Sequence, residues 1–175
     1  MSTDSGKRKY QALALGTSDA LGTFNDNFFK QAGLLLAVTT GNAVFQSQVT
    51  FLFALPFVLF SAWSGWLADR FAKKSLVICA KTLELAAMLA GAWGMVTLDW
   101  NWMLAMTFCM GLSSTLFSPA LNGSIPELFP VGQVPRIHAL FKLGTTASIQ
   151  FGMFLAGTGM DREWEGRASP FGHWQ

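Results

Sequence analysis

Four polar side chains interrupt an apolar stretch near the start of the chain: Asn25, Asp26, Asn27 and Lys30. Carboxylate, amide and ammonium groups together can bind a polar or zwitterionic ligand. On a helix, Asp26 and Lys30 would lie one turn apart on one face, which Asp19 continues two turns earlier. They would either pair with each other or contact a ligand. These four residues are the predicted substrate-binding residues, and the alternative is a purely structural polar contact between helices.

The element that must position them has the length and apolar content of a membrane-spanning helix, over residues 11–39. A span crosses a hydrocarbon core of about 30 Å with about 20 residues. Each charged side chain at the bilayer centre costs about 2.5–3.5 kcal/mol on insertion scales. We therefore expect the polar groups to face the interior of a helical bundle or a water-filled cavity, on the path of a substrate or an ion.

Composition places the whole chain in the membrane class. Of its 175 residues, 51% are hydrophobic and 13% are charged, and the apolar runs are too long for a soluble globular protein. The formal net charge of +2 is too small to indicate nucleic-acid binding. We predict an all-α membrane protein with five spans, near residues 11–39, 49–67, 75–97, 102–121 and 136–157. Residues 1–9 would be a basic cytoplasmic N-terminus, residues 10–160 the helical part and residues 161–175 a polar tail.

The third predicted span carries Lys81 and Glu84 three residues apart, and they are interpreted as an intramembrane charge pair. Lys81 would alternatively extend towards the membrane surface, whereas Glu84 lies deeper and should face the bundle interior.

The small residues of the fourth span predict a helix-packing face rather than chemistry. They are Gly111, Ser114, Thr115 and Ser118. Four prolines after them, at positions 119, 126, 130 and 135, predict a loop over residues 120–135.

Basic residues set the expected topology. Seven Lys and Arg residues lie in the N-terminus, in the connection at 68–74 and at Arg136, and the first and third connections have none. The positive-inside rule then puts the N-terminus in the cytoplasm. The sequence shows no nucleophile with a matching base, no metal-ligand spacing and no phosphate-binding loop, so we expect neither an enzyme nor a cofactor or metal.

The connection between the second and third spans resembles the signature loop of the major facilitator superfamily, Gly-x-x-x-Asp-Arg/Lys-x-Gly-x-Arg/Lys. The matching residues are Gly65, Asp69, Arg70 and Lys74, with Lys73 as an additional cation, and Ala72 stands where the family usually has glycine. The resemblance implies a conformational-switch motif that stabilises one state of alternating access through charge contacts with the facing half of the transporter.

Three segments resemble the bacterial lysophospholipid transporter branch of that superfamily, which includes transporter domains fused to acyltransferase and acyl-carrier-protein synthetase modules. They are residues 24–30, 118–120 and 123–128, and Leu121 stands where several relatives have lysine. The resemblance implies a secondary transporter of lysophosphatidylethanolamine-like lipids in the bacterial inner membrane. Its expected partners are membrane lipids, the lysophospholipid substrate, a C-terminal transporter half and an acyltransferase or acyl-ACP synthetase.

A superfamily half has six helices, so five predicted spans indicate an N-terminal fragment. Two alternative functions stay open. A major facilitator antiporter of drugs or small solutes would use Asp26 as a proton-coupling carboxylate. A non-transporting membrane anchor would hold a lipid-acylating enzyme at the membrane.

Overall fold

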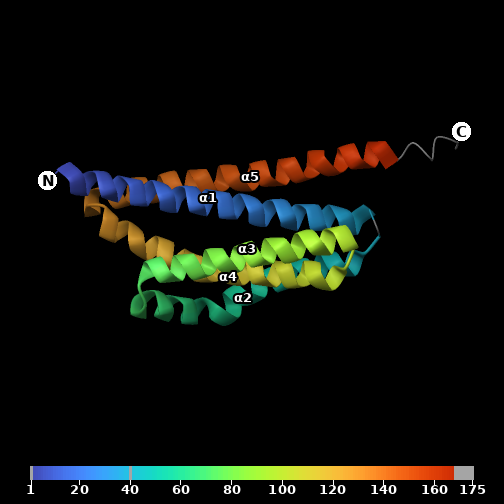
Figure 1. The fold of residues 1–175 in the computed structure, drawn as a ribbon, viewed down its shortest axis with the longest axis horizontal. Helices are drawn as coiled ribbons and strands as arrows, with labels where there is room; N and C mark the ends of the chain where they lie inside the picture. The colour runs from blue at the N-terminus through green and yellow to red at the C-terminus, as the bar shows by residue number, and fades with distance from the viewer. Residues whose placement is uncertain (1, 40, 168–175) are drawn as a thin grey trace, which may run out of the picture.

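The protein is an all-α membrane protein, as its sequence predicts. The computed structural model describes residues 2–39 and 41–167. In these residues the elements are α1 (Ser2–Thr39), α2 (Ala43–Arg70), α3 (Lys73–Thr97), α4 (Trp100–Leu128), a 3₁₀ turn η1 (Val131–Gln133) and α5 (Val134–Arg167). Figure 1 shows the long helices side by side, with α1 and α5 in one layer and α2, α3 and α4 in the other.

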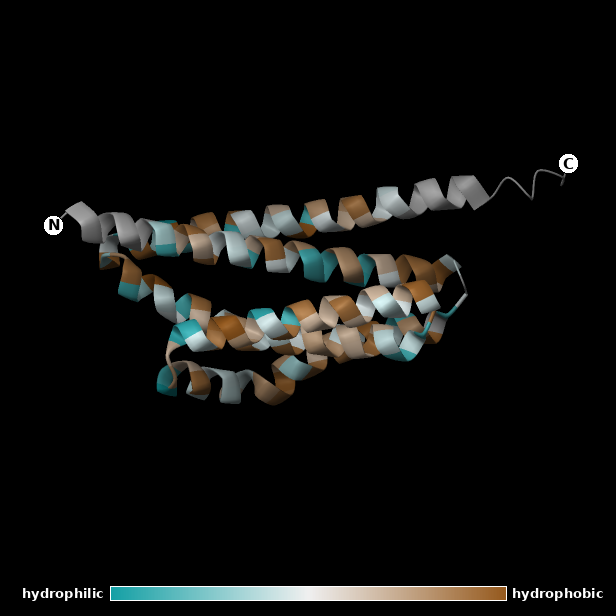
Figure 2. Cartoon of the chain, in the orientation of Figure 1, coloured by the Kyte–Doolittle hydropathy of each residue, from teal (hydrophilic) through white to brown (hydrophobic). Residues whose placement is uncertain are grey.

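Three of the described helices are long and apolar enough to cross a membrane. Their spans are Val44–Arg70 in α2, Lys73–Thr97 in α3 and Trp100–Leu128 in α4. The lengths of α1 and α5 also suffice, but both carry more charged and polar residues, and Figure 2 shows hydrophilic stretches along α1. Several of these residues face the cavity described below, as expected for polar groups in a membrane bundle.

Helix α4 lies at the centre of its layer. It packs against both α2 and α3, while α5 packs mainly against α1. Half of the most apolar window of α4 is buried inside the protein, compared with 17% for α2. Helix α2 therefore presents most of its apolar side chains outward, where lipid or another helical segment can cover them.

Small residues let the backbones of this layer approach closely. A Cβ atom at Gly111 of α4 would lie 2.5 Å from the carbonyl oxygen of Phe53 in α2. On the other side of α4, the hydroxyl of Ser113 donates a hydrogen bond of 2.7 Å to the carbonyl of Ala80 in α3. The predicted packing role is thus correct for Gly111.

The predicted loop over residues 120–135 is too long, because the connection between α4 and α5 covers only residues 129–133. Helix α4 continues through Pro119 and Pro126 to Leu128, and Pro135 lies in the first turn of α5, where its missing N–H breaks no helical bond. Ala120 is fully buried and packs in a cluster with residues of α2 and α3. Membrane helices tolerate proline where neighbouring helices support the backbone, and this packing provides such support.

Three helices also extend beyond the expected spans. Helix α1 begins at Ser2, so most of the expected basic N-terminal segment belongs to it. Helix α2 begins at Ala43, where the side chain of Asn42 caps it by accepting a hydrogen bond of 3.1 Å from the Phe45 amide. Helix α5 continues to Arg167, into the expected polar tail, and residues 168–175 of that tail lie outside the described part.

Candidate functional site

A polar cavity of about 400 Å³ lies between the two layers of helices, lined mainly by α1, α3, α4 and α5. Three carboxylates line it, those of Asp19, Asp26 and Glu84, together with the ammonium groups of Lys81 and Lys142. Asp19 and Asp26 are seven residues apart on α1, so their spacing brings both to one side of that helix. The cavity therefore gathers opposite charges inside a membrane bundle.

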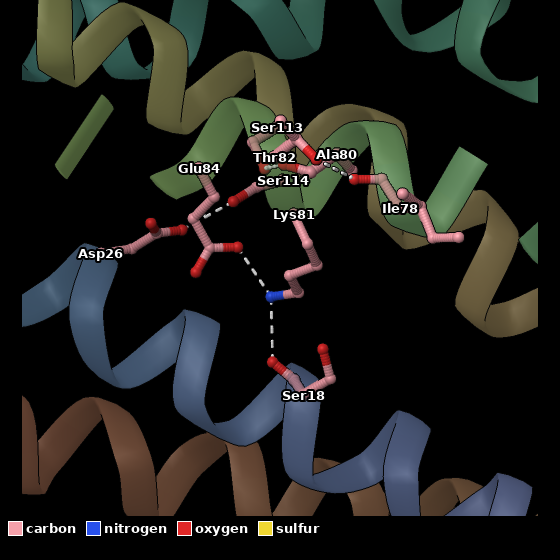
Figure 3. Close-up of polar contacts among 9 residues, drawn as sticks. All are labelled: Ser18, Asp26, Ile78, Ala80, Lys81, Thr82, Glu84, Ser113 and Ser114. Carbon is pink, nitrogen blue, oxygen red and sulfur yellow. Dashed lines mark hydrogen bonds and ion pairs between the residues drawn. The ribbon is translucent and has the colours of Figure 1, made fainter. Parts of the chain in front are cut away.

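Asp26 is one of two buried acids of this cavity, with 6% of its surface exposed, compared with 7% for Glu84. Its Oδ2 atom accepts a hydrogen bond of 2.7 Å from the hydroxyl of Ser114 in α4 (Figure 3). Its Oδ1 atom is buried and has no hydrogen-bond partner among the described residues. Because buried polar atoms are normally paired, this oxygen is an acceptor that a donor on a ligand can satisfy.

Lys81 and Glu84 form an ion pair in α3, with 2.6 Å between Nζ and Oε2. The Lys81 ammonium also donates to the carbonyl of Ser18 in α1 at 2.9 Å, and it lies 4.6 Å from the ring centroid of Phe117. Figure 3 shows Lys81 reaching from α3 to α1. These contacts hold Lys81 in place and link the two layers of helices.

Gly22 makes room for this ion pair. A Cβ atom there would lie 2.9 Å from Oε1 of Glu84 and would also collide with the ammonium of Lys81.

The other three predicted substrate-binding residues do not line the cavity. The ammonium of Lys30 lies 4.5 Å from the ring centroid of Phe53 in α2. Asn27 donates a hydrogen bond of 2.8 Å to the carbonyl of Thr23, and Asn25 is half-buried beside it. Within the described residues, no ion pair joins Asp26 to Lys30. Asp26 and Lys30 therefore do not form the internal pair that was one of the two predicted arrangements.

Several residues of the cavity wall were not predicted from the sequence. Ser114 and Ser118 were assigned to helix packing, but both line the cavity. Asp19 accepts a hydrogen bond of 2.8 Å from the hydroxyl of Thr145, which joins α1 to α5. Lys142 also lines the cavity, and its spacing of three residues from Thr145 on α5 could have indicated a shared face.

The signature-loop residues lie together at the end of the bundle where α2 meets α3. Lys73 forms an ion pair with Glu127 of α4 and donates a hydrogen bond of 2.8 Å to the carbonyl of Gly123. The Arg70 guanidinium lies 5.2 Å from the ring centroid of Trp66. Both cations therefore contact other groups of this chain.

Asp69 is exposed and lines a second hollow of about 390 Å³ together with Lys73 and Glu127. Lys74 is also exposed. A Cβ atom added at Gly65 would meet nothing within 4 Å. Among the described residues, Asp69 and Lys74 have no ion-pair partner, and Gly65 borders open space, so another part of the protein can contact the motif here.

Long apolar helices around a charged internal cavity define a multi-pass membrane protein with the architecture of a membrane transporter. The chain belongs to the Major Facilitator Superfamily, whose family profile matches residues 17–166.

Curated relatives support this assignment. The chain is 29% identical over 146 residues to the lysophospholipid transporter LplT of Salmonella heidelberg (strain SL476). The matched residues cover 83% of this chain and 35% of that protein. It is 30% identical over 111 residues to the uncharacterized MFS-type transporter YfiS of Bacillus subtilis (strain 168), covering 61% of this chain and 25% of that protein. The chain thus spans about a third or less of the length of these relatives. No solved structure matches it.

Proposed function

We propose that this chain forms the N-terminal part of a secondary transporter that moves lysophospholipids across the bacterial inner membrane. The similarity to the LplT relatives supports the substrate class, and the charged cavity supports a zwitterionic headgroup. The observation that carries the proposal is the buried Oδ1 atom of Asp26, which has no partner among the described residues. A headgroup ammonium supplies the donor that this oxygen needs.

The chemistry of the cavity suits a lipid with a charged headgroup. A hydrogen bond between an ammonium and a carboxylate contributes about 1.5–3 kcal/mol. The apolar side chains of Phe57, Phe117 and Leu121 line the same cavity and can contact the start of an acyl chain. The charged lining residues can therefore contact a polar headgroup, and the apolar ones can contact the acyl chain, within the same cavity.

The proposed orientation has the N-terminus in the cytoplasm. The start of α1, the α2–α3 connection and the α4–α5 connection lie at the same end of the bundle (Figure 1), and the basic residues are concentrated there. Cysteines introduced at Gly41 and Asp99, in the connections at the other end, should react with a membrane-impermeant reagent added outside intact cells. Reaction only after the cells are opened would reverse the orientation.

The functional test is uptake of lysophosphatidylethanolamine by vesicles that contain the full-length gene product. Asp26→Asn keeps the size and the Ser114 contact but removes the charge, so uptake should fall roughly ten- to hundredfold at wild-type abundance. Asp99→Asn is the matched control, since asparagine also caps a helix and Asp99 lies outside the cavity. Normal uptake by Asp26→Asn would exclude Asp26 as the headgroup site.

A second candidate is an antiporter of drugs or small solutes. The burial of Asp26 beside Glu84 favours it, because a carboxylate in this setting can exchange a proton during transport. In that case wild-type vesicles would not take up lysophosphatidylethanolamine. They would instead expel a cationic dye in response to a proton gradient, and Asp26→Asn would abolish that response.

A further inference from the structure

The wall of the cavity formed by the first turns of α5 carries donors that the proposed headgroup site does not use. His138 and Lys142 are four residues apart on α5 and so lie on one face. Both line the cavity, together with Asn122 of α4. Among the described residues, the side chains of His138 and Lys142 make no hydrogen bond or ion pair. The Asn122 amide has a single long contact, 3.5 Å to the hydroxyl of Ser118.

Of the two lysines that line the cavity, Lys142 is the one available to a ligand. Lys81 already contacts Glu84, the Ser18 carbonyl and the Phe117 ring. An ammonium, an imidazole and an amide that converge on one space are donors suited to a tetrahedral oxyanion, above all a phosphate. This group of residues therefore suits a negatively charged group, whereas the Asp26 site suits a positively charged one.

The register of α1 and α5 separates the two sites. Both helices run in the same direction side by side (Figure 1), and the hydrogen bond between Thr145 and Asp19 aligns them. Lys142 comes three residues before Thr145, and Asp26 comes seven residues after Asp19. Ten residues of helix correspond to about 15 Å along the axes. This separation of the two backbone positions is long compared with an ethanolamine headgroup, so the two groups of residues lie at different levels of the cavity.

We propose that Lys142, His138 and Asn122 form a phosphate subsite near the α4–α5 connection, distinct from the ammonium site at Asp26. The subsite binds the phosphate of a headgroup at the end of the bundle where the basic connections lie, before the ammonium reaches Asp26. The identity of the ligand as a lipid rests on the proposed function, whereas the binding of a phosphate group does not. The same donors would bind inorganic phosphate, and the two sources are distinguished by experiment.

The test measures binding of two soluble probes, glycerophosphoethanolamine and inorganic phosphate, to the purified full-length gene product in detergent. Lys142→Gln should weaken binding of glycerophosphoethanolamine about tenfold or more, because it removes a charge-assisted hydrogen bond to the phosphate. Arg136→Gln is the matched control, since Arg136 is an exposed cation of the same helix that does not line the cavity. Its affinity for the probe should equal that of the wild type.

Comparison of the probes identifies the source of the phosphate. Tighter binding of glycerophosphoethanolamine than of inorganic phosphate supports a headgroup subsite, and equal binding of both supports a general phosphate subsite. The proposal is overturned if neither probe binds the wild type, if Lys142→Gln binds as tightly as the wild type, or if Arg136→Gln weakens binding as much as Lys142→Gln does. Because no transport is measured, failure of lysophosphatidylethanolamine uptake would count against the proposed function without deciding this result.

Discussion

The two acidic residues in the deep part of the cavity differ in what compensates their charge. Glu84 has an ammonium partner 2.6 Å away, in Lys81. Asp26 has one hydrogen bond from the hydroxyl of Ser114 and a second oxygen with no partner among the described residues. A compensated buried ion pair can stabilise the structure, whereas an acceptor without a partner is open to a donor on a ligand, which is the role that we propose for Asp26. The roles of the two carboxylates therefore follow from their neighbours rather than from their depth.

The structural role of the ion pair can be tested by removing one partner. Lys81→Met keeps an unbranched side chain that is one atom shorter and leaves Glu84 without its cation, which should destabilise the protein by about 3–5 kcal/mol. The double variant Lys81→Met/Glu84→Gln removes both charges and should regain most of this loss. Thermal unfolding of the purified full-length protein in detergent measures both effects. A double variant as unstable as the single one would show that the loss comes from the contacts of Lys81 with Ser18 and Phe117 rather than from the unpaired charge of Glu84.

Sequence alone identified Asp26, Lys81 and Glu84 as intramembrane polar groups because charges are rare inside spans. It could not place Lys30, because helical periodicity gives the face of a helix but not the neighbour that covers each turn. One turn beyond Asp26, that face meets Phe53 of α2 instead of the cavity. The contact of Ser114 with the cavity could not be predicted for a similar reason, since its hydroxyl bonds to Asp26 of another helix.

At the scale of elements, hydropathy predicted the number and order of the helices but not their ends. Helix α4 shows why. Two prolines normally mark the end of a helix, but here Ala120, Leu121 and Ile125 are buried against other helices and keep the backbone helical beyond Pro119. This packing depends on contacts with residues far away in the sequence. Local propensity alone therefore placed the end of the helix too early.

Close packing of α2 against α4 predicts a strong effect at Gly111. In Gly111→Ala the new methyl group would meet the Phe53 backbone carbonyl, which cannot rotate away, so we expect a loss of about 1–3 kcal/mol of stability. Gly144→Ala is the matched control on α5, where a Cβ atom would meet nothing within 4 Å. There the better helix propensity of alanine should leave stability unchanged or raise it by up to about 1 kcal/mol. Thermal unfolding in detergent compares the two, and equal melting temperatures would contradict the close packing.

At the scale of the whole molecule, the described residues leave large apolar surfaces on α2 and α5. Val58 and Trp63 of α2 are exposed, as are Leu143 and Phe154 of α5. Apolar surface of this extent is covered by lipid or by another protein segment. Since the part of the LplT relative that matches this chain is only 35% of that protein, both coverings are available in a full-length transporter. The signature loop lies at the end of α2, beside one of these surfaces.

Asp69 is the signature-loop residue best placed to contact another part of the transporter. Asp69 is exposed, whereas Lys73 is paired with Glu127 and Arg70 lies over the ring of Trp66. Asp69→Asn should therefore leave the stability of the protein unchanged but remove a charge contact that favours one state of alternating access. The test introduces cysteines at the two mouths of the full-length protein, which are its cytoplasmic and external openings. Their reactivity should change several-fold, rising at one mouth and falling at the other. Glu127→Gln, which breaks the pair with Lys73 inside this chain, should instead lower the melting temperature. Unchanged reactivity at both mouths in Asp69→Asn would show that the loop acts only as a topological signal.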